Sequence, residues 1–470
     1  MREWQPKVII VGGGFSGLAT AFELQSRLQQ ASIEVLESSK RLGGMLGTVK
    51  SQEYLVDLGP YHFPGDCLGI MKLCHQLKLQ QEMVPLHPQA TRRFVLYDNT
   101  IQPLPCTLGQ ALTSPLFGMA SAYHLVTERF RSHRSASNKH DESVYQFIER
   151  RAGKELADIL ADTLTTERFS SDGKVISIRA GFAEIFRAER EYGSVTAGYA
   201  KLKEAEKQAA AKAGIQLSSR NYALSEGMQT LVEALQARLA NPPVCEVGVT
   251  SLQPAAEGMQ NRWVVQCTDG QTRTADIVVL ACSIPKQSAL VADLDNELSD
   301  FMLQIPVAGI ISLSLAYSRQ HVPSMVDNHS IVIPQKLNKD IHKIEFISSV
   351  LPDRAPSGKV FMRLTLGGLA RKEMLSWEED ALILAARREL RNLLRITKPP
   401  QFCHIQKWPR AIPQYTLGHQ GRVQQIMERL KRHDGLYLAG NGYYGVTLSE
   451  TATHAERIAR SIRDYIHTWK

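Results

Sequence analysis

The stretch Lys7–Glu37 constrains the fold of this chain more than any other. Lys7–Val11 is a short apolar run rich in β-branched residues, which predicts a buried parallel strand. Three glycines follow at the spacing G-x-G-x-x-G, and apolar residues then recur at helical intervals. A second apolar run, Ile33–Leu36, ends at Glu37, 20 positions after Gly17. This order of strand, glycine turn, helix, strand and acid predicts a dinucleotide-binding βαβ unit.

Each part of the motif has a physical task. Gly12 permits a tight turn, Gly14 leaves room for a pyrophosphate against the backbone, and Gly17 lets the helix pack closely on the strand. The helix N-terminus offers free N–H groups and partial positive charge to the phosphates. Glu37 can accept hydrogen bonds from a ribose. The predicted cofactor loop comprises Gly12, Gly13, Gly14, Phe15, Ser16 and Gly17.

A second glycine pair distinguishes FAD from NAD. Gly43 and Gly44 stand behind Arg41, shortly after Glu37, where they would close over the pyrophosphate from the other side. FAD domains of the glutathione-reductase type usually have such an element, and NAD domains rarely do. The alternative, an ordinary turn without a ligand, is disfavoured by the coupling of this pair to Glu37. The sequence therefore predicts FAD.

Composition excludes several classes of protein. The seven cysteines show neither a C-x-x-C pair nor zinc-ligand spacing, which indicates buried thiols in a reducing, cytoplasmic compartment. The formal charge of +8 permits attraction to an anionic membrane surface, but no basic stripe with interleaved aromatics indicates nucleic acid. No apolar run approaches the roughly 18–20 residues of a membrane span. The first strand begins near residue 7, so we expect no cleavable leader.

The middle of the chain changes character. Leu68–Leu79 predicts a helix, and two short apolar runs around Asp98-Asn99 predict a hairpin. Residues 107–220 are mainly helical in pattern. Within them Arg129–Asp141 is polar and basic, and either a solvated loop or a contact with anionic lipid fits it. Its four cations are Arg129, Arg131, Arg134 and Lys139.

Strand patterns return after residue 222. Val244–Leu252, Trp263–Thr268 and Ile277–Ala281 predict strands that complete a doubly wound sheet, and Leu436–Asn441 predicts another before the final helix, Ser449–Ile466. The cofactor domain is therefore discontinuous, and two other parts are inserted into it. The fold class is α/β, with a Rossmann-like FAD-binding domain of glutathione-reductase type, an inserted α+β substrate domain and a helical domain.

Later motifs carry a resemblance to a known family. These are SVYQFIERRAGKELADIL, SSDGKVISIRAGFAEIFRAEREYGSV, LSEGMQTLVEAL, WPRAIPQYTLGHQGRV and GLYLAGNGYYGV. In this order, over some 400 residues, they resemble the FAD-dependent protoporphyrinogen and coproporphyrinogen oxidases of the amine-oxidase-like superfamily. The resemblance implies an FAD-binding domain of residues 1–88, 223–288 and 432–470. It also implies a substrate domain of residues 89–106 and 289–431, and a helical, membrane-facing part of residues 107–222.

The resemblance also assigns residues to the flavin. Met45 lies near the ring, and Gly59, Pro60, Tyr61 and His62 line the isoalloxazine side. Val249 is assigned to the adenine. The residues assigned to the ring and its ribityl end are Asn441, Val446, Thr447 and Leu448. Together with Arg41 and Gly44 these complete the predicted cofactor site. No metal site and no catalytic side chain is predicted.

The implied reaction is dehydrogenation of a porphyrinogen in haem biosynthesis, with hydride transfer to flavin N5 and reoxidation by O2. The substrate propionates would need a cation, and the candidates are Arg168, Arg179 and Arg410. Each of them can instead be an ordinary surface or structural cation. A homodimer and a peripheral contact with the membrane are also left open.

Two stretches depart from the family pattern. Tyr61-His62 puts an aromatic ring and an imidazole beside the flavin, although a hydrogen-bonded structural role is the commoner one for such a histidine. Thr447, Ser449, Glu450 and Thr451 replace the usual start of the last helix. Two alternatives therefore stay open. One is an amine oxidase or desaturase-like flavoenzyme acting on another hydrophobic metabolite, and the other is a flavin-fold scaffold without turnover.

Overall fold

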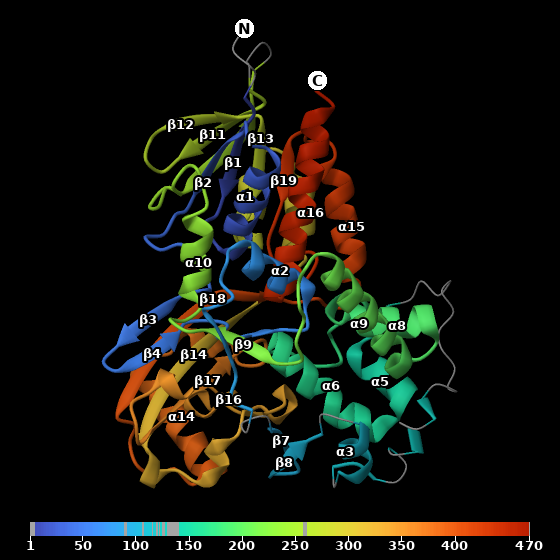
Figure 1. Cartoon of the computed structure of the whole chain (residues 1–470), viewed down its shortest axis with the longest axis vertical. Coiled ribbons are helices and arrows are strands. Elements are labelled where there is room, and N and C mark those ends of the chain that lie inside the picture. The colour runs from blue at the N-terminus through green and yellow to red at the C-terminus, as the bar shows by residue number, and fades with distance from the viewer. Residues whose placement is uncertain are drawn as a thin grey trace.

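The protein is described by a computed structural model, which covers residues 5–88, 92–105, 108–114, 116–118, 121, 123–124, 127–128, 141–256 and 261–469. Figure 1 shows three regions: a parallel sheet with its helices at the top, a larger sheet at the lower left, and a group of helices at the lower right. The two sheet regions bring together segments that are far apart in the sequence.

Four strands form the parallel sheet predicted from the βαβ motif. They are β1 (Lys7–Val11), β2 (Ser32–Leu36), β13 (Ile277–Leu280) and β19 (Leu436–Leu438), in the order β19-β13-β1-β2. Every neighbouring pair is parallel. Since both faces are covered, β13 is fully buried and its residues are uniformly apolar. The predicted α/β fold class is confirmed.

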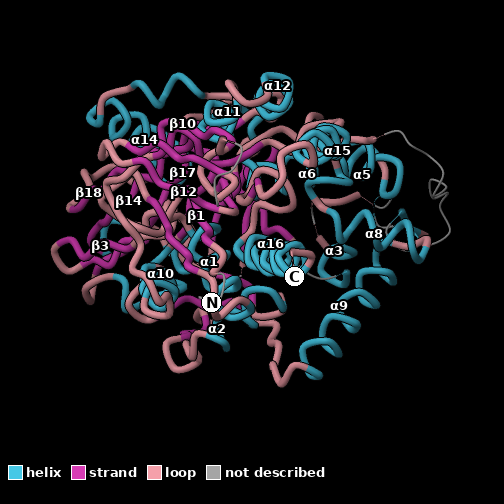
Figure 2. The backbone as a smooth tube through the Cα atoms, turned by 90° about the horizontal axis from the view of Figure 1, so that it is seen from above, coloured by secondary structure: helices cyan, strands magenta, loops and turns pink. Residues whose placement is uncertain are grey.

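Helices cover both faces of this sheet. One face is covered by the N-terminal and C-terminal helices, which pack against each other, as the view from above shows (Figure 2). The helices on this face are α1 (Phe15–Arg27), α2 (Leu68–Gln76), α10 (Gln229–Gln236) and α16 (Leu448–His467). The other face carries α11 (Ile284–Val291), α12 (Asn296–Leu303) and α15 (His419–Leu430). Both α12 and α15 come from the range 289–431, which was predicted as part of the substrate domain.

One predicted part of the sheet is wrong. The strands β10 (Val249–Pro254), β11 (Trp263–Cys267) and β12 (Thr272–Ala275) do not extend the parallel sheet but form an antiparallel sheet of their own. Their apolar side chains, including that of Trp263, join the core on one face of the parallel sheet. Alternating burial suits this one-sided packing, whereas a strand buried on both faces reads as a continuous apolar run.

A seven-stranded sheet forms the second region. Its order is β18-β14-β17-β16-β15-β7-β8, and α14 (Glu379–Leu394) packs on it. The strands are β7 (Arg93–Tyr97), β8 (Thr100–Leu104), β14 (Val307–Ser318), β15 (Ser330–Val332), β16 (Ile341–Glu345), β17 (Lys359–Gly367) and β18 (Phe402–Pro413). The predicted hairpin at Asp98-Asn99 is confirmed, and both residues have positive φ, as a type I′ turn requires.

Short elements connect the two sheets. The hairpin β3 (Thr48–Ser51) and β4 (Tyr54–Asp57) lies beside a small sheet in the order β5-β9-β6. The strands of that sheet are β5 (Phe63–Pro64), β6 (Met83–Pro85) and β9 (Asn221–Leu224). Short helical turns occupy α13 (Ile347–Val350), η2 (Arg319–His321), η3 (Ser324–Asp327), η4 (Gln335–Leu337), η5 (Pro352–Arg354) and η6 (Lys372–Ser376).

The third region is helical, as predicted. Its helices are α3 (Leu108–Thr113), α5 (Val144–Ala152), α6 (Lys154–Phe169), α7 (Ile178–Gly181), α8 (Ala183–Tyr192) and α9 (Val195–Lys212). Gly153, with φ of +91°, separates α5 from α6. The four cations predicted in the basic stretch, Arg129, Arg131, Arg134 and Lys139, lie outside the described residues. Within the described ranges, no helix is long and apolar enough to cross a bilayer.

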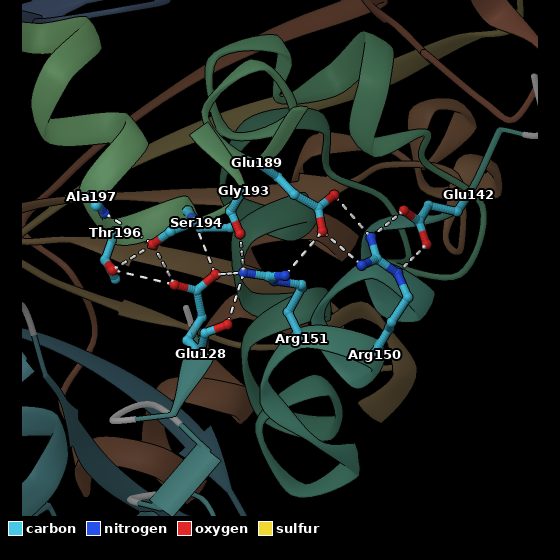
Figure 3. A network of polar contacts seen from close by, with 10 residues as sticks. Glu128, Glu142, Arg150, Arg151, Glu189, Gly193, Ser194, Thr196 and Ala197 are labelled. Carbon is cyan, nitrogen blue, oxygen red and sulfur yellow. Dashed lines mark hydrogen bonds and ion pairs between the residues drawn. The ribbon is translucent and has the colours of Figure 1, made fainter. Parts of the chain in front are cut away.

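Buried charges hold the helical region together (Figure 3). Arg151 is 2% exposed and contacts the carboxylates of Glu128 and Glu189, which are themselves buried. The neighbouring Arg150 bridges Glu189 at 2.6 Å and Glu142 at 2.7 Å. Glu128 also accepts hydrogen bonds from Ser194 Oγ at 2.8 Å and from the Val195 backbone N–H at 2.9 Å. The network therefore joins α5 to α8 and to the start of α9.

We expect Arg151→Met to lower the free energy of unfolding by about 3–5 kcal/mol, because it leaves buried carboxylates without their cation. Urea unfolding followed by circular dichroism measures this change. Arg187→Met is the control, since Arg187 and Glu191 form an exposed pair within one helix and its loss should cost about 0.5 kcal/mol or less. Equal effects of the two substitutions would contradict a structural role for the buried network.

Candidate functional site

The glycine loop after β1 is fixed by backbone contacts that exclude side chains. Gly12 has φ of +116°, and a Cβ there would lie 2.9 Å from backbone atoms of Ala281 and Cys282 after β13. A Cβ on Gly17 would lie 1.9 Å from the Gly12 carbonyl oxygen. The tight turn and the close helix packing expected of these two glycines are therefore enforced by the fold.

Glu37 lies at the end of β2 and faces the same loop. Its Oε2 accepts a hydrogen bond from the Gly13 backbone N–H at 2.8 Å, and its Oε1 accepts one from the Ser39 N–H at 2.8 Å. A carboxylate has about four acceptor positions, so capacity for a ribose hydroxyl remains. The Val247 N–H donates to the Glu37 carbonyl at 2.9 Å, which brings Val249 at the start of β10 close to this end of the sheet.

A second loop closes against the first. Gly14 and Gly43 form a parallel β-bridge, and the Gly43 N–H donates to the Gly13 carbonyl at 2.8 Å. A Cβ on Gly14 would meet only the Gly44 Cα, at 3.9 Å. The two loops thus leave a cradle at Gly14 that a side chain would fill. Phe15 is buried at the start of α1, and Ser16 beside it is partly exposed.

Arg41 holds the second loop from within. Its guanidinium donates to the carbonyls of Leu42 at 3.0 Å and Leu46 at 2.6 Å, and also to that of Gly44 at 2.5 Å. Burial lowers the pKa of Arg41 below its ordinary value. All of these donors bind carbonyls of the second loop. Arg41 therefore holds the shape of that loop at the cradle.

The loop after β4 links this cradle to the large sheet. A Cβ on Gly59 would lie 2.3 Å from the Met45 carbonyl oxygen, so the loop with Pro60 packs on the second glycine loop. Trp408 Nε1 donates to the Leu58 carbonyl at 2.9 Å, and the Arg363 guanidinium donates to the Gly59 carbonyl. Sequence reasoning missed Arg363, because only the tertiary structure brings β17 to this loop.

Tyr61 and His62 follow in the same loop. Their rings are 4.4 Å apart, and the Arg363 guanidinium carbon lies 4.7 Å from the Tyr61 ring centre. Burial raises the pKa of Tyr61 well above its ordinary value and lowers that of His62 well below. In the described part of the chain, His62 Nδ1 has no hydrogen-bond partner. The hydrogen-bonded structural role considered for His62 is therefore not observed at this nitrogen.

The C-terminal turn joins the site from a third direction. Tyr415 Oη donates to the Asn441 carbonyl at 2.8 Å and accepts from the Gly445 N–H at 2.8 Å. Val446 then leads to Thr447, which caps α16 in a capping box with Glu450, ahead of Leu448. The unusual residues of this turn thus start the helix by ordinary capping chemistry.

The three cations considered for substrate anions differ in their surroundings. Arg168 forms two hydrogen bonds to Glu450, at 2.6 and 2.7 Å, and so supports the cap of α16. Arg179 lies over the Phe186 ring, and Arg410 is exposed near the end of β18. A cation that was not predicted, Arg93 on β7, lies close enough to lower the pKa of His62. It pairs with Glu167 at 3.1 Å.

Comparison with known proteins decides what this arrangement is. The family model for flavin-containing amine oxidoreductases matches residues 15–463, nearly the whole chain. The chain belongs to this family. It is an FAD-dependent oxidoreductase, as the glycine motif and the second glycine pair predicted.

Relatives match this flavoenzyme from end to end. Coproporphyrinogen III oxidase of Bacillus subtilis (strain 168) is 22% identical over 96% of this chain and 96% of its own length. Protoporphyrinogen oxidase of Bos taurus is 29% identical, over 97% of this chain and 98% of its own. A crystal structure from Exiguobacterium sp. 255-15, provisionally assigned as a protoporphyrinogen oxidase, has a TM-score of 0.80 at 19% identity, covering 98% of this chain and 99% of its own.

The residues of the flavoenzyme fit FAD. The cradle between Gly14 and Gly44 is bordered by the N-terminus of α1, whose free N–H groups favour a pyrophosphate. Glu37 lies at the end of β2 with acceptor capacity for a ribose hydroxyl. No group of three or more metal-ligating side chains occurs within the residues that the structure describes.

We expect Gly14→Val to abolish flavin binding while the protein stays folded. The backbone φ of −69° suits any residue, and no atom of the first loop would clash with the new Cβ, but the side chain would fill the cradle. The ratio of flavin to protein absorbance measures the loss, with the thermal unfolding midpoint as the test of folding. Gly421→Ala, on α15 with no neighbour within 4 Å, is the control and should keep its flavin.

Tyr415→Phe should weaken flavin retention, because the buried Gly445 N–H loses its acceptor at a cost of about 1–3 kcal/mol. Flavin release during dialysis or dilution measures this effect. Tyr317→Phe is a matched control, since Tyr317 is equally buried and its hydroxyl has no partner in the described structure. If both variants released flavin alike, the Tyr415 bridge would have no role in holding the turn.

Proposed function

We propose that this flavoenzyme dehydrogenates a porphyrinogen, protoporphyrinogen IX or coproporphyrinogen III, to the porphyrin in tetrapyrrole synthesis. The observation that carries the proposal is the end-to-end match to relatives that bear these names, at 22–29% identity. The site agrees with it. Loop 58–62 joins the cofactor cradle to the seven-stranded sheet through Trp408 and Arg363, and the macrocycle is proposed to bind at this junction.

The chemistry is three two-electron dehydrogenations with O2 as the final acceptor, so one porphyrinogen and three O2 give one porphyrin and three H2O2. Bound FAD supplies the group that accepts two electrons at N5. The chain itself must hold the macrocycle and keep water away. Trp408 and Arg363 help to hold the macrocycle. They bind the carbonyls of Leu58 and Gly59 and so set the position of Pro60–His62.

We propose the following holders of FAD. The pyrophosphate lies at the glycine loop and the adenosine ribose at Glu37, with Val249 beside the adenine. The ring lies against Met45 and the loop 59–62, and its ribityl end against Asn441 and residues 446–448. The N-terminus of α16, capped by Thr447, would favour negative charge on the reduced ring. Residues 1–88, 223–288 and 432–470 form the FAD-binding part in this assignment.

Arg93 is the proposed partner of a substrate carboxylate. Its side chain is 31% exposed, and its charge lowers the pKa of both His62 and His329, so it lies near both imidazoles. Arg168 is held by Glu450, and Arg410 forms no ion pair with the residues that the structure describes. A guanidinium that pairs with only one carboxylate keeps donors for a second one.

An alternative is an amine oxidase or desaturase-like activity on another hydrophobic metabolite. The polar Tyr61-His62 pair beside the proposed ring position favours it. Structural similarity extends to putrescine oxidase, with a TM-score of 0.68 at 13% identity, covering 97% of this chain and 98% of that one. Anaerobic mixing with a panel of amines and porphyrinogens, followed by loss of flavin absorbance, separates the two activities.

The helical region is the proposed contact with a membrane surface, in a protein that otherwise resides in the cytoplasm. Tyr192 and Tyr199 are about 40% exposed at α8 and α9, and Lys201 and Lys203 lie over their rings. Exposed aromatic rings beside lysines suit a lipid interface. A homodimer is also part of the proposal. Sedimentation without vesicles tests the dimer, and sedimentation with anionic vesicles tests the membrane contact.

The purified protein should be yellow and, with either porphyrinogen in air, should form porphyrin fluorescence and about three H2O2 for each porphyrin. Under anaerobic conditions the same substrates should bleach the flavin. A folded, flavin-loaded protein that is silent with protoporphyrinogen and coproporphyrinogen would contradict the proposal.

Arg93→Met should raise KM by about tenfold or more, as expected for a lost charge-assisted hydrogen bond of about 1.5–3 kcal/mol, with flavin content unchanged. Steady-state kinetics with coproporphyrinogen measure it. Glu167→Gln keeps the cation and removes only its partner, so its KM should change by less than about threefold. Arg410→Met, the exposed control, should match wild type. An equal rise in KM for Arg410→Met would exclude a specific role for Arg93.

A further inference from the structure

Three buried polar atoms in and next to loop 58–62 have no hydrogen-bond partner among the described residues. They are Tyr61 Oη, His62 Nδ1 and His329 Nε2. The His62 and His329 rings lie 5.8 Å apart, edge to face, and Tyr61 stands 4.4 Å from His62. We refer to Tyr61, His62 and His329 as the imidazole cluster. It joins the loop to the residue preceding β15.

Such a convergence needs an explanation. A buried polar atom without a partner costs about 1–3 kcal/mol, and native proteins rarely leave several together. One buried histidine of this sheet does find a partner, since His342 Nε2 lies 3.1 Å from Ser170 Oγ, whereas His404 Nε2 on β18 has none among the described residues. The cluster lies at the junction of the proposed flavin position with the large sheet. Its free atoms therefore point to a ligand rather than to packing.

The imidazoles of the cluster are neutral. Burial lowers the pKa of His329 to about 4 and that of His62 well below its ordinary value. The positive charges of Arg93 on β7 and Lys343 on β16 act in the same direction on both rings. The buried carboxylate of Glu345 acts in the opposite direction and raises the pKa of both imidazoles, but Lys343 and Arg363 pair with it, both at 2.7 Å, and burial outweighs it.

Neutral imidazoles present lone pairs. His329 Nδ1 lies 3.0 Å from Ser330 Oγ, and when Nδ1–H donates to this hydroxyl, Nε2 becomes an acceptor. Buried acceptor nitrogens repel a carboxylate and attract a donor. Tyr61 Oη can accept a hydrogen bond as well. In this tautomer the cluster suits a ligand that offers N–H or O–H groups and carries no negative charge at that point.

We propose that the imidazole cluster positions the substrate by accepting hydrogen bonds from its pyrrole N–H groups, while Arg93 on β7 holds a carboxylate. This inference rests on the proposed function, because a porphyrinogen carries four pyrrole N–H donors and no ring acceptor. It assigns Tyr61, His62 and His329, which depart from an apolar flavin pocket, a role in substrate specificity.

The test compares variants of the flavin-loaded full-length chain. His329→Phe should raise KM for coproporphyrinogen by about tenfold and weaken binding of the porphyrin product, measured by fluorescence quenching, to a similar extent. Flavin content and the thermal unfolding midpoint should stay within error of wild type. His329→Gln, whose amide oxygen can still accept, should recover most of the affinity. Tyr61→Phe should act in the same direction, more weakly.

Tyr317→Phe is the matched control, because it removes another buried, unpartnered hydroxyl outside the cluster. Equal KM values and equal porphyrin binding for wild type, His329→Phe and Tyr61→Phe would overturn the inference and leave the proposed function intact. A lower unfolding midpoint with unchanged KM would also overturn it, since it would show a structural role. If wild type turned over no porphyrinogen, both this inference and the proposed function would be contradicted.

Discussion

The close approach of three backbone segments at the carboxyl ends of β1 and β13 is the constraint on which the rest depends. Gly12 touches the backbone of Ala281 and Cys282, and Gly17 touches Gly12 itself, so no side chain can be accommodated at either position. These contacts fix where α1 begins and where its free N–H groups point. They also join the N-terminal βαβ unit to a strand that follows some 240 residues later. A dinucleotide site needs this rigidity, because a pyrophosphate is bound by backbone groups that cannot adjust independently.

From this point a relay of contacts reaches the large sheet. Gly14 pairs with Gly43, Gly59 packs on Met45, and Trp408 and Arg363 hold the carbonyls of the next loop. Each step is a backbone contact or a hydrogen bond to a backbone carbonyl, so the path tolerates little movement. The seven-stranded sheet is therefore positioned by the same loops that form the glycine cradle. The helical region, in contrast, is held by its own charge network around Arg151.

The secondary structure was largely predictable. The strand Lys7–Val11 and the hairpin at Asp98-Asn99 follow from local pattern and turn chemistry, and the structure confirms them. The same reasoning failed for β10–β12, since strand pattern does not reveal whether a strand pairs with one sheet or packs on it. For charged groups the sequence left the choice open. Arg168 was one of three candidate substrate cations, each with a structural alternative, and the structure pairs it with Glu450, 282 positions later.

By itself the sequence determined the cofactor and the fold class, because glycine spacing and an acid at the right distance act through local backbone geometry. The family followed from the resemblance of the later motifs. Only the tertiary structure decided what surrounds the flavin loop. Arg93 and Arg363 come from two strands of one sheet, and His329 directly precedes a third. Nothing in their local sequence distinguishes them from other buried or paired side chains. Whether an imidazole is neutral, or an arginine is already paired, depends on burial and on charges brought from distant segments. The glycine motif could therefore be interpreted from the chain alone, whereas the polar groups beside it required the fold.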